Sequence, residues 1–362
     1  MLVLMTGLPG TGKSTVAAAL ARELGAALLS TDRIRAERSG PQAFSDADKG
    51  GVYERMLARA ARGLSAGRRV ILDGTFYLER LRRAGAAVGR RARVPVFVVE
   101  VVAPVPIVRR RMGRRLLKAQ GPAPAAFAVH NYVRRLFEPV RGRPFVIDTA
   151  DPAAWKRDVA LIANAMRVLE AERRMIAPLR RTRPLGLVQT HISWVLLDGA
   201  RAYKIKKPVR FSFVDYTTPG RRLAYCRREI EANRRLSPDL YLGLVPVCDD
   251  GGSVSFGGPG RTVDHAVAMR ELPQASRLDR MISRGRAGAA DIRRIVAALC
   301  DFHARASRAG PRFGSPQAVR GLFEHAFRLR PLIERELGAG AVVDRVRRRY
   351  IREANSVIPG AF

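Results

Sequence analysis

The feature that most constrains this chain is a glycine-rich loop near its N-terminus, which runs Gly7-Leu8-Pro9-Gly10-Thr11-Gly12-Lys13-Ser14 and continues into Thr15. The loop matches G-x-x-x-x-G-K-[ST] in full, after an apolar run (2–5) that predicts a strand and before a predicted helix (13–24). Glycines let successive backbone N–H groups converge on phosphate oxygens, and the helix N-terminus adds its positive dipole end. The pattern therefore predicts a nucleoside triphosphate site, with Lys13 at the β- and γ-phosphates and Ser14 as a ligand of Mg²⁺.

The first 150 residues alternate short apolar runs with longer helical patterns, which is typical of a parallel sheet covered by helices. We expect strands at 2–5, 27–30, 69–73, 94–102 and 145–148. Helices are expected at 13–24, 46–65, 78–91, 106–118 and 125–138, with a break at 121–124, and a long closing helix at 152–175. The pattern predicts an α/β domain over residues 1–176 with a five-stranded parallel sheet.

Two carboxylates follow strands of this predicted sheet. Asp32 comes directly after the second strand, and Asp73 is the last residue of the third. Because the carboxyl ends of parallel strands gather at the edge where ligands bind, both are expected beside the phosphate loop. One could accept the proton of an acceptor hydroxyl while the other orients Mg²⁺ or holds the substrate, as phosphoryl transfer requires. The structural alternatives are a helix N-cap for Asp32 and a turn residue for Asp73.

A third candidate group is the arginine-rich run Val108-Arg109-Arg110-Arg111-Met112-Gly113-Arg114-Arg115. Arginines on a helix with a glycine break fit a mobile lid that closes over phosphates and supplies positive charge in the transition state. The alternative is a solvated basic face, because arginine is the usual cation of this chain.

The second half of the chain has a different pattern, after a basic segment at 178–184 that we interpret as a domain boundary. Apolar and polar residues alternate at 191–197 and 201–206 around Asp198-Gly199, which predicts an antiparallel hairpin. A helix at 218–236, a hairpin at 244–248 and 253–256 and a strand at 267–272 follow, and the pattern is helical from 277 onward.

Lysine usage singles out one strand of this half, since three of the chain's seven lysines fall at Lys204, Lys206 and Lys207. A strand lysine paired with a helix glutamate, here Glu229 or Glu231, clamps ATP phosphates in protein-kinase-like folds. A basic exposed strand is the alternative.

Composition limits the classes of protein to which the chain can belong. Its 66 lysines and arginines against 32 acidic residues give a net charge of +34. Such a charge indicates a polyanionic partner, with nucleic acid as the first candidate. The alternative is a generally arginine-rich composition, with the arginines dispersed over many helix faces. No apolar stretch reaches the ~18 residues of a membrane helix, and no secretory signal is recognisable. The three cysteines are widely spaced without a C-x-x-C pair, which disfavours disulfides and cysteine zinc sites and fits a reducing cytoplasm.

Residues 1–150 resemble the P-loop kinases of the polynucleotide-kinase-like, AAA_33 type. The resemblance rests on the phosphate loop, Thr31-Asp32-Arg33-Ile34-Arg35, Leu72-Asp73-Gly74-Thr75 with Glu79-Arg80, the arginine helix and Leu136-Phe137-Glu138-Pro139. It implies ATP and Mg²⁺, with phosphoryl transfer to a hydroxyl of a small molecule or a nucleic-acid end. It further implies Asp32 as general base, Arg35 and Asp73 on the acceptor side, Asp73 with Ser14 near Mg²⁺, and Arg110 and Arg114 acting with Lys13 on the transferring phosphoryl.

Residues 187–330 resemble the aminoglycoside-phosphotransferase-like domain that is fused to such P-loop kinases in bacteria, more often in the opposite order. Matching stretches include 203–209, 233–236, 240–243, 269–273 and 313–316. The resemblance implies Lys204 as a phosphate clamp and Glu229 as its partner. The chain departs from the family after Phe302-His303, where neither a catalytic-loop Asp nor a later Asp for Mg²⁺ is found. We therefore expect residues 185–362 to form a protein-kinase-like α+β N-lobe and an incomplete helical C-lobe, without catalysis of their own.

Three functional hypotheses fit these residues. The first is an ATP- and Mg²⁺-dependent phosphotransferase with a hydroxyl acceptor. The second is a nucleotide-binding regulatory or scaffold ATPase without a phosphoacceptor. The third is a nucleic-acid end kinase, which would give the positive charge of the chain a purpose. The sequence predicts neither the acceptor nor the oligomeric state.

Overall fold

The computed structural model describes residues 1–37, 46–118, 126–307 and 340–357, together with Arg320, Gly321, Glu324, Phe327 and Glu334. The chain divides into two compact units, Met1–Leu272 and Pro273–Phe362. The break expected at 121–124 and the matching stretch 313–316 lie outside the described residues.

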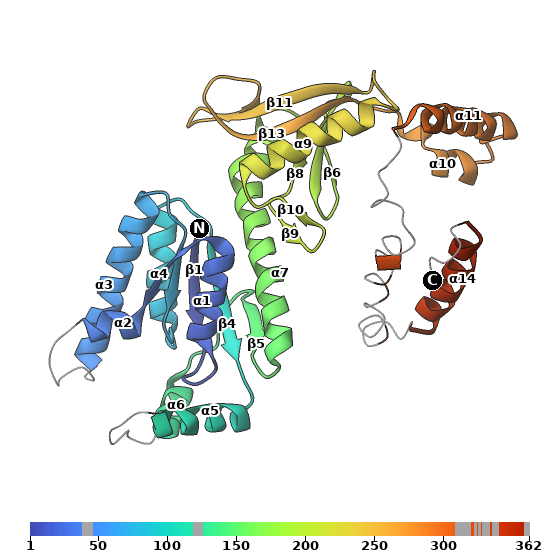
Figure 1. Ribbon diagram of the computed structural model, residues 1–362. Helices are drawn as coiled ribbons and strands as arrows, with labels where there is room; N and C mark the ends of the chain where they lie inside the picture. Colours follow the sequence, from blue (N-terminus) through green and yellow to red (C-terminus); the bar gives the residue numbers. More distant parts are fainter. Residues whose placement is uncertain are drawn as a thin grey trace. The chain divides into compact units, whose positions relative to one another are not determined.

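The first unit begins with a parallel sheet whose five strands follow the spatial order β2-β3-β1-β4-β5 (Figure 1). The strands are β1 (Leu2–Thr6), β2 (Ala27–Ser30), β3 (Val70–Asp73), β4 (Val96–Val102) and β5 (Phe145–Asp148). All neighbours pair in parallel, so the carboxyl ends of the five strands lie at one edge. The prediction of an α/β protein with a five-stranded parallel sheet is confirmed.

Helices cover both faces of this sheet, because its central strand is apolar on each side. On β1, Val3 and Met5 point into a core that α1 (Lys13–Leu24) and α7 (Pro152–Ala171) complete. Leu2 and Leu4 point into the opposite core. That core is closed by α2 (Thr31–Ala36), α3 (Asp46–Ser65) and α4 (Glu79–Arg91). The alternation of side chains along a strand therefore produces two separate cores from one apolar run.

Two further helices, α5 (Val105–Lys118) and α6 (Ala126–Leu136), follow β4 and pack against each other. Helix α5 is continuous through Gly113, so the glycine break invoked for a mobile lid is not present. The arginines of this run lie on one regular helix.

The long closing helix extends beyond its predicted end and carries one irregular turn. Helix α7 continues through a π-helical turn, η1 (Glu172–Ile176), into α8 (Ala177–Thr182). The segment 178–184, interpreted above as a boundary, is thus mostly helical. Met175 and Ile176 of η1 and Leu179 of α8 are buried in the core of a second sheet. A domain boundary between residues 176 and 185 stays a prediction.

The second sheet is antiparallel, with the order β12-β11-β13-β8-β7-β6. Its strands are β6 (Gly186–Gln189), β7 (Ser193–Leu197), β8 (Arg201–Lys206), β11 (Tyr241–Asp249), β12 (Val254–Phe256) and β13 (Arg261–Arg270). One face, with Trp194 and Tyr203, packs on η1 and α8, and the other packs on Cys226 and Ile230 of α9 (Pro219–Arg234). Both predicted hairpins are present, whereas β6 and the short pair β9 (Arg210–Phe211) and β10 (Val214–Asp215) were not predicted.

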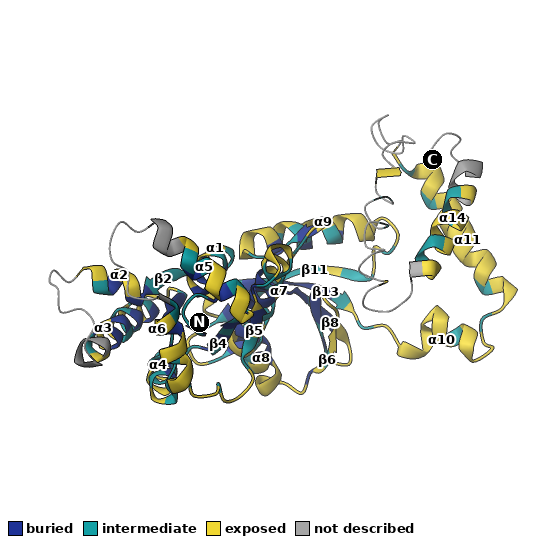
Figure 2. Ribbon diagram, turned by 90° about the horizontal axis from the view of Figure 1, so that it is seen from below, coloured by how far each residue is buried: buried dark blue, intermediate teal, exposed yellow. Residues whose placement is uncertain are grey.

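The described part of the second unit is helical, as expected from residue 277 onward. It contains a short 3-10 turn, η2 (Gln274–Ser276), and the helices α10 (Leu278–Ser283), α11 (Ala289–Arg305) and α14 (Gly340–Val357). Helices α10 and α11 have no buried residue, and Figure 2 shows them largely exposed. Within the described residues, no helix combines the length and the apolar character that crossing a bilayer requires.

Candidate active site

The phosphate loop changes direction at three glycines before α1 begins. Gly7, Gly10 and Gly12 have φ values of 135°, 85° and 96°, which L side chains rarely adopt. A Cβ on Gly7 would lie 2.3 Å from the carbonyl oxygen of Val101 on β4, so the neighbouring main chain also excludes a side chain there. Helix α1 starts at Lys13, which brings its positive N-terminal end to the loop.

Lys13 and Thr11 hold the loop in its curled shape. Lys13 Nζ and Thr11 Oγ1 each donate a hydrogen bond to the carbonyl oxygen of Leu8, both at 2.9 Å. Both side chains are buried. The Lys13 ammonium is therefore fixed inside the curl, where the motif predicts the β- and γ-phosphates.

Asp73, at the carboxyl end of β3, is the buried carboxylate of the site and is 4% exposed. Its burial raises its pKa, and the nearby charge of Asp32 acts in the same direction. Hydrogen bonds from Ser14 and Ser30 and the Lys13 ammonium oppose the rise without cancelling it. A carboxylate and a hydroxyl side by side at the loop are oxygen donors of the kind that Mg²⁺ binds.

Asp32 is the accessible carboxylate of the site. Ser30 caps α2 by accepting a hydrogen bond from the Asp32 N–H at 3.3 Å, so the N-cap role considered for Asp32 belongs to Ser30. The Asp32 side chain is 79% exposed and forms an ion pair with Arg35 at 3.1 Å. The carboxylate is thus open to a substrate and oriented by a neighbouring guanidinium.

A cavity of about 320 Å³ joins these groups. Five predicted site residues line its polar side: Lys13, Ser14, Asp32, Arg35 and Asp73. Its apolar wall comes from one face of α6, with the residues Val129, Tyr132, Val133 and Leu136 at helical spacing. An apolar wall that remains open to solvent fits a ligand with an apolar or planar part. The sequence predicted the helix but gave no sign that its apolar face borders the site.

Arg82 on α4 fixes the end of α6 next to this cavity. Its guanidinium is buried and donates hydrogen bonds to the carbonyl oxygens of Phe76, Glu138 and Pro139 at 2.8, 3.0 and 2.9 Å. The Glu79 carboxylate accepts from Arg82 at 3.0 Å. Sequence reasoning noted Glu79 and 138–139 as part of a resemblance but missed Arg82, because nothing in the sequence separates one buried arginine from many exposed ones.

A second cavity, of about 360 Å³, shares Gly10 and Gly12 with the first and includes Thr15, Arg111, Arg114, Thr149 and Trp155. Arg111 donates to the Thr149 hydroxyl and carbonyl, both at 2.7 Å, and to the Thr11 carbonyl at 3.2 Å. Of the two predicted lid arginines, Arg114 lines this cavity, while Arg110 is exposed and lines neither cavity. Arg111, which the sequence did not single out, is the arginine that attaches α5 to the loop.

In the second sheet, Glu229 of α9 binds two lysines of β8. The ammonium groups of Lys204 and Lys206 each lie 2.6 Å from a carboxylate oxygen of Glu229. Burial alone would raise the pKa of Glu229, but the hydrogen bonds from both lysines outweigh it and lower that pKa. Glu231 is exposed. The role of Lys204 and Glu229 as a phosphate clamp stays a prediction.

Residues 2–140 match the model of the AAA_33 family, described as an AAA domain. Uncharacterised proteins of Mycobacterium tuberculosis and Mycobacterium bovis are 35% identical to the chain over 120 residues, which are 33% of this chain and 22% of theirs. The chain thus covers about a fifth of the length of these curated relatives. The expectation of an AAA_33-type P-loop domain at the N-terminus is confirmed.

Several solved structures are similar to part of the chain. Kti12 of Chaetomium thermophilum, in complex with ADP-AlF3, is 23% identical with a TM-score of 0.38, over 46% of this chain and 99% of that one. The APS kinase CysC of Mycobacterium tuberculosis, in complex with AMPPNP and APS, is 22% identical with a TM-score of 0.35, over 44% of this chain and 94% of that one. A gluconokinase of Sinorhizobium meliloti is 17% identical with a TM-score of 0.36, over 48% and 94%.

Proposed function

We propose that the protein is a phosphotransferase that moves the γ-phosphoryl group of ATP to a hydroxyl group of an acceptor. The observation that carries the proposal is the position of Lys13, Ser14, Asp32 and Asp73 around one cavity at the phosphate loop. A module that only binds nucleotide needs the loop and its lysine. An accessible and a buried carboxylate facing the same space are what a proton acceptor and a metal-side oxygen ligand require.

The acceptor occupies the 320 Å³ cavity, with its hydroxyl between Asp32 and the phosphate loop. Asp32 accepts the hydroxyl proton as the acceptor oxygen bonds to the γ-phosphorus and the bond to the leaving ADP oxygen breaks. Arg35 keeps the Asp32 carboxylate in position through their 3.1 Å ion pair. Lys13 places positive charge beside the phosphoryl oxygens.

Ser14 and Asp73 fit Mg²⁺ by the chemistry of their donors, since the hydroxyl and the carboxylate already hydrogen-bond each other at the loop. When bound, Mg²⁺ neutralises charge on the β- and γ-phosphates. Asp73, buried and hydrogen-bonded to Ser30 as well, holds the Ser14 hydroxyl at this place.

The nucleoside of ATP belongs, in this proposal, to the 360 Å³ cavity on the α5 side of the loop. Trp155 offers an aromatic surface there, and Arg114 reaches the same space. Arg111 keeps α5 attached to the loop through its bonds to Thr149 and Thr11. We therefore retain Arg114, together with Arg111, as an arginine at the nucleotide, whereas Arg110 lines neither cavity.

The apolar face of α6 favours an acceptor whose hydroxyl lies next to an apolar or planar group over a plain polyol. A nucleic-acid end remains among these acceptors, because bases have planar faces and a net charge of +34 attracts phosphates. An acceptor of this kind would contact Tyr132 and Leu136 with its planar part and Asp32 with its hydroxyl.

The second sheet is, in our proposal, a protein-kinase-like N-lobe of the aminoglycoside-phosphotransferase type that does not catalyse transfer. Support comes from the antiparallel sheet with α9 on one face and from the 2.6 Å pair of Lys204 and Glu229. The role that we propose for this lobe is nucleotide binding, with Lys204 as the phosphate clamp.

Acceptor-dependent ATP consumption by the full chain tests the main proposal, with sugars, nucleosides and RNA or DNA 5′ ends as acceptors. With the acceptor so identified, Asp32→Asn should lower kcat at least about 100-fold, because the hydroxyl loses its proton acceptor. The Kd for ATP should change less than about threefold, since the variant leaves the loop and Lys13 intact. Lys13→Ala should remove ATP binding.

Glu54→Gln is the matched control, because it removes an exposed carboxylate of α3 that does not line the cavity. It should leave kcat unchanged. An unchanged kcat in Asp32→Asn would refute the base assignment. ATP binding without consumption across the whole panel would favour a nucleotide-binding regulatory module.

A further inference from the structure

A third cavity, of about 330 Å³, lies away from the phosphate loop, where the end of α7 and η1 meets the second sheet. Residues from β11, β13 and α9 complete its wall, together with Arg69, which precedes β3. The irregular π-turn of η1 matters here, because such turns reorient side chains and are frequent at functional sites. It carries Arg174 into the cavity wall.

The wall of this third cavity carries more positive than negative charge. Five arginines line it (Arg69, Arg167, Arg174, Arg222 and Arg261), against the carboxylates of Glu170, Asp249 and Asp264. Cationic residues in such excess at one concave surface attract an anionic ligand.

Two of the three carboxylates are paired with cations, and the third accepts a hydrogen bond from the main chain. Asp264 pairs with Arg222 at 2.9 Å, and Glu170 pairs with Arg69 at 2.8 Å and with the N-terminal ammonium at 3.0 Å. Asp249 accepts the N–H of Gly251 at 2.9 Å. In the part of the chain that the structure describes, no ion pair joins Arg174 or Arg261 to a carboxylate. Arg174 and Arg261 are thus exposed cations without an ion pair, and Asp249, the strand neighbour of Arg261, is the one carboxylate of the wall that is not paired with a cation in the part of the chain that the structure describes.

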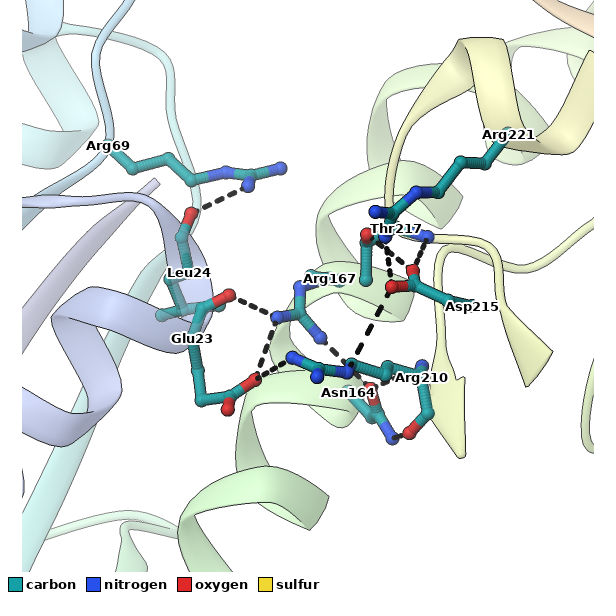
Figure 3. A network of polar contacts seen from close by, with 9 residues as sticks. All are labelled: Glu23, Leu24, Arg69, Asn164, Arg167, Arg210, Asp215, Thr217 and Arg221. Carbon is teal, nitrogen blue, oxygen red and sulfur yellow. Dashed lines mark hydrogen bonds and ion pairs between the residues drawn. The ribbon is translucent and has the colours of Figure 1, made fainter. Parts of the chain in front are cut away.

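Two other arginines of the wall are held rigidly by main-chain carbonyls at the end of α1. Arg69 donates to the carbonyl oxygen of Leu24 at 2.9 Å, and Arg167 donates to that of Glu23 (Figure 3). Arg167 is 3% exposed and also donates to Asn164 at 3.0 Å. These contacts fix the position of the guanidinium groups before any ligand arrives, which lowers the entropic cost of binding an anion.

We propose that this third cavity is a binding site for a small phosphate-bearing anion, held by Arg174 and Arg261 and framed by Arg69, Arg167 and Arg222. Guanidinium groups bind phosphate oxygens through paired N–H donors, and a cavity of this size admits a phosphate or a diphosphate group. The site is separate from the phosphate loop and does not depend on the transfer reaction proposed above.

Titration of inorganic pyrophosphate into the full chain by calorimetry tests the proposal. The protein is first saturated with ADP in Mg²⁺-free buffer, so that the phosphate loop is already occupied. We expect one further equivalent of pyrophosphate to bind, and the double variant Arg174→Gln/Arg261→Gln to weaken it at least tenfold. The same titration on the Lys13→Ala chain without ADP should give the same result.

The control variant Arg173→Gln/Arg180→Gln also removes two positive charges, from exposed positions of η1 and α8 outside the cavity. Its affinity for pyrophosphate should change less than twofold. Equal weakening in both double variants would overturn the proposal, because it would mean general attraction to a basic chain. Absence of binding to the ADP-saturated protein would also overturn it. Should the double variant fail to fold, the single Arg→Gln variants must each weaken binding at least threefold.

Discussion

The surroundings of Asp73 disfavour the charged form of its carboxylate. It is buried at the carboxyl end of β3, and burial raises its pKa above the ordinary value of 3.8 despite hydrogen bonds from Ser14 and Ser30. A group with a raised pKa adds to folding stability below its unfolded pKa, and that contribution is lost as the pH rises through its folded pKa. At neutral pH the ionised carboxylate is therefore destabilising, which fits the role proposed for Asp73 beside Mg²⁺.

We predict that Asp73→Asn stabilises the nucleotide-free protein at pH 7, since it removes a buried charge while keeping the shape of the side chain. The advantage over the unsubstituted protein should shrink as the pH is lowered toward 3, where Asp73 itself becomes neutral. Urea unfolding at both pH values measures the difference. Asp32→Asn, at a largely exposed carboxylate, is the control and should change stability by less than about 0.5 kcal/mol. A variant that is less stable at pH 7 would contradict the argument.

Residues fixed by a motif could be placed from the sequence, whereas residues fixed by tertiary packing could not. Lys13, Ser14, Asp32 and Asp73 meet at one cavity because a phosphate loop and strand ends share one edge of a parallel sheet. Arg82, Arg111 and Trp155 are defined by which carbonyls or cavities they reach, and that depends on elements distant in the chain. In a chain with many arginines, no local pattern reveals those that are buried.

At the scale of elements, one carboxylate of α9 binds two lysines of the second sheet, in addition to the apolar contacts and the Arg222–Asp264 pair of the same helix. Glu229 bridges Lys204 and the buried Lys206, both at 2.6 Å. Its pKa is lowered, because hydrogen bonds from the two lysines outweigh the effect of burial. Its contribution to stability is therefore present above its unfolded pKa and is lost as the pH falls through its folded pKa.

We predict that Glu229→Gln destabilises the protein by about 3 kcal/mol at pH 7, because Lys206 is left buried without a carboxylate partner. Urea unfolding measures this loss, which should diminish toward pH 3. Glu231→Gln removes a carboxylate from the exposed face of the same helix and should cost less than about 0.5 kcal/mol. Equal losses in the two variants would show that the bridge does not hold α9.

The elements that the sequence predicted are those with a clear apolar period, and the missed ones are short or exposed. Strand β6 has four residues, mostly exposed, and forms only by pairing with β7. The pair β9 and β10 has two residues in each strand. Asn164 of α7 supports β9 by donating to the Arg210 carbonyl at 2.8 Å and accepting its N–H at 2.9 Å. Because Asn164 lies 46 positions before Arg210 in the sequence, the residues around β9 give no local sign that this strand forms.

At the scale of the first unit, one continuous helical segment packs on both sheets. This segment, called the rod here, consists of α7, η1 and α8. Its α7 part buries Val159 and Met166 against the parallel sheet, and its η1 and α8 part buries Met175, Ile176 and Leu179 against the antiparallel one. The sequence suggested a domain boundary at 178–184 because this segment is basic. Leu179 of this segment is nevertheless buried in the core of the antiparallel sheet, next to Met175 and Ile176 of η1.

Fragments test whether the rod joins the two sheets into one folding unit. Residues 1–182 retain Met175, Ile176 and Leu179 but lose Trp194, Leu196 and Tyr203, against which they pack. Each of these three side chains, once exposed, loses about 2 kcal/mol of the free energy gained by burial. This fragment should therefore bind an apolar dye strongly. Residues 1–272, which keep the whole first unit, should bind little dye and unfold in one transition.

Residues 1–171, which end before η1, should bind less dye than 1–182, because the three apolar side chains are gone. If 1–182 bound no more dye than 1–272, the antiparallel sheet would not be needed to cover the rod, and the shared core would have no energetic role.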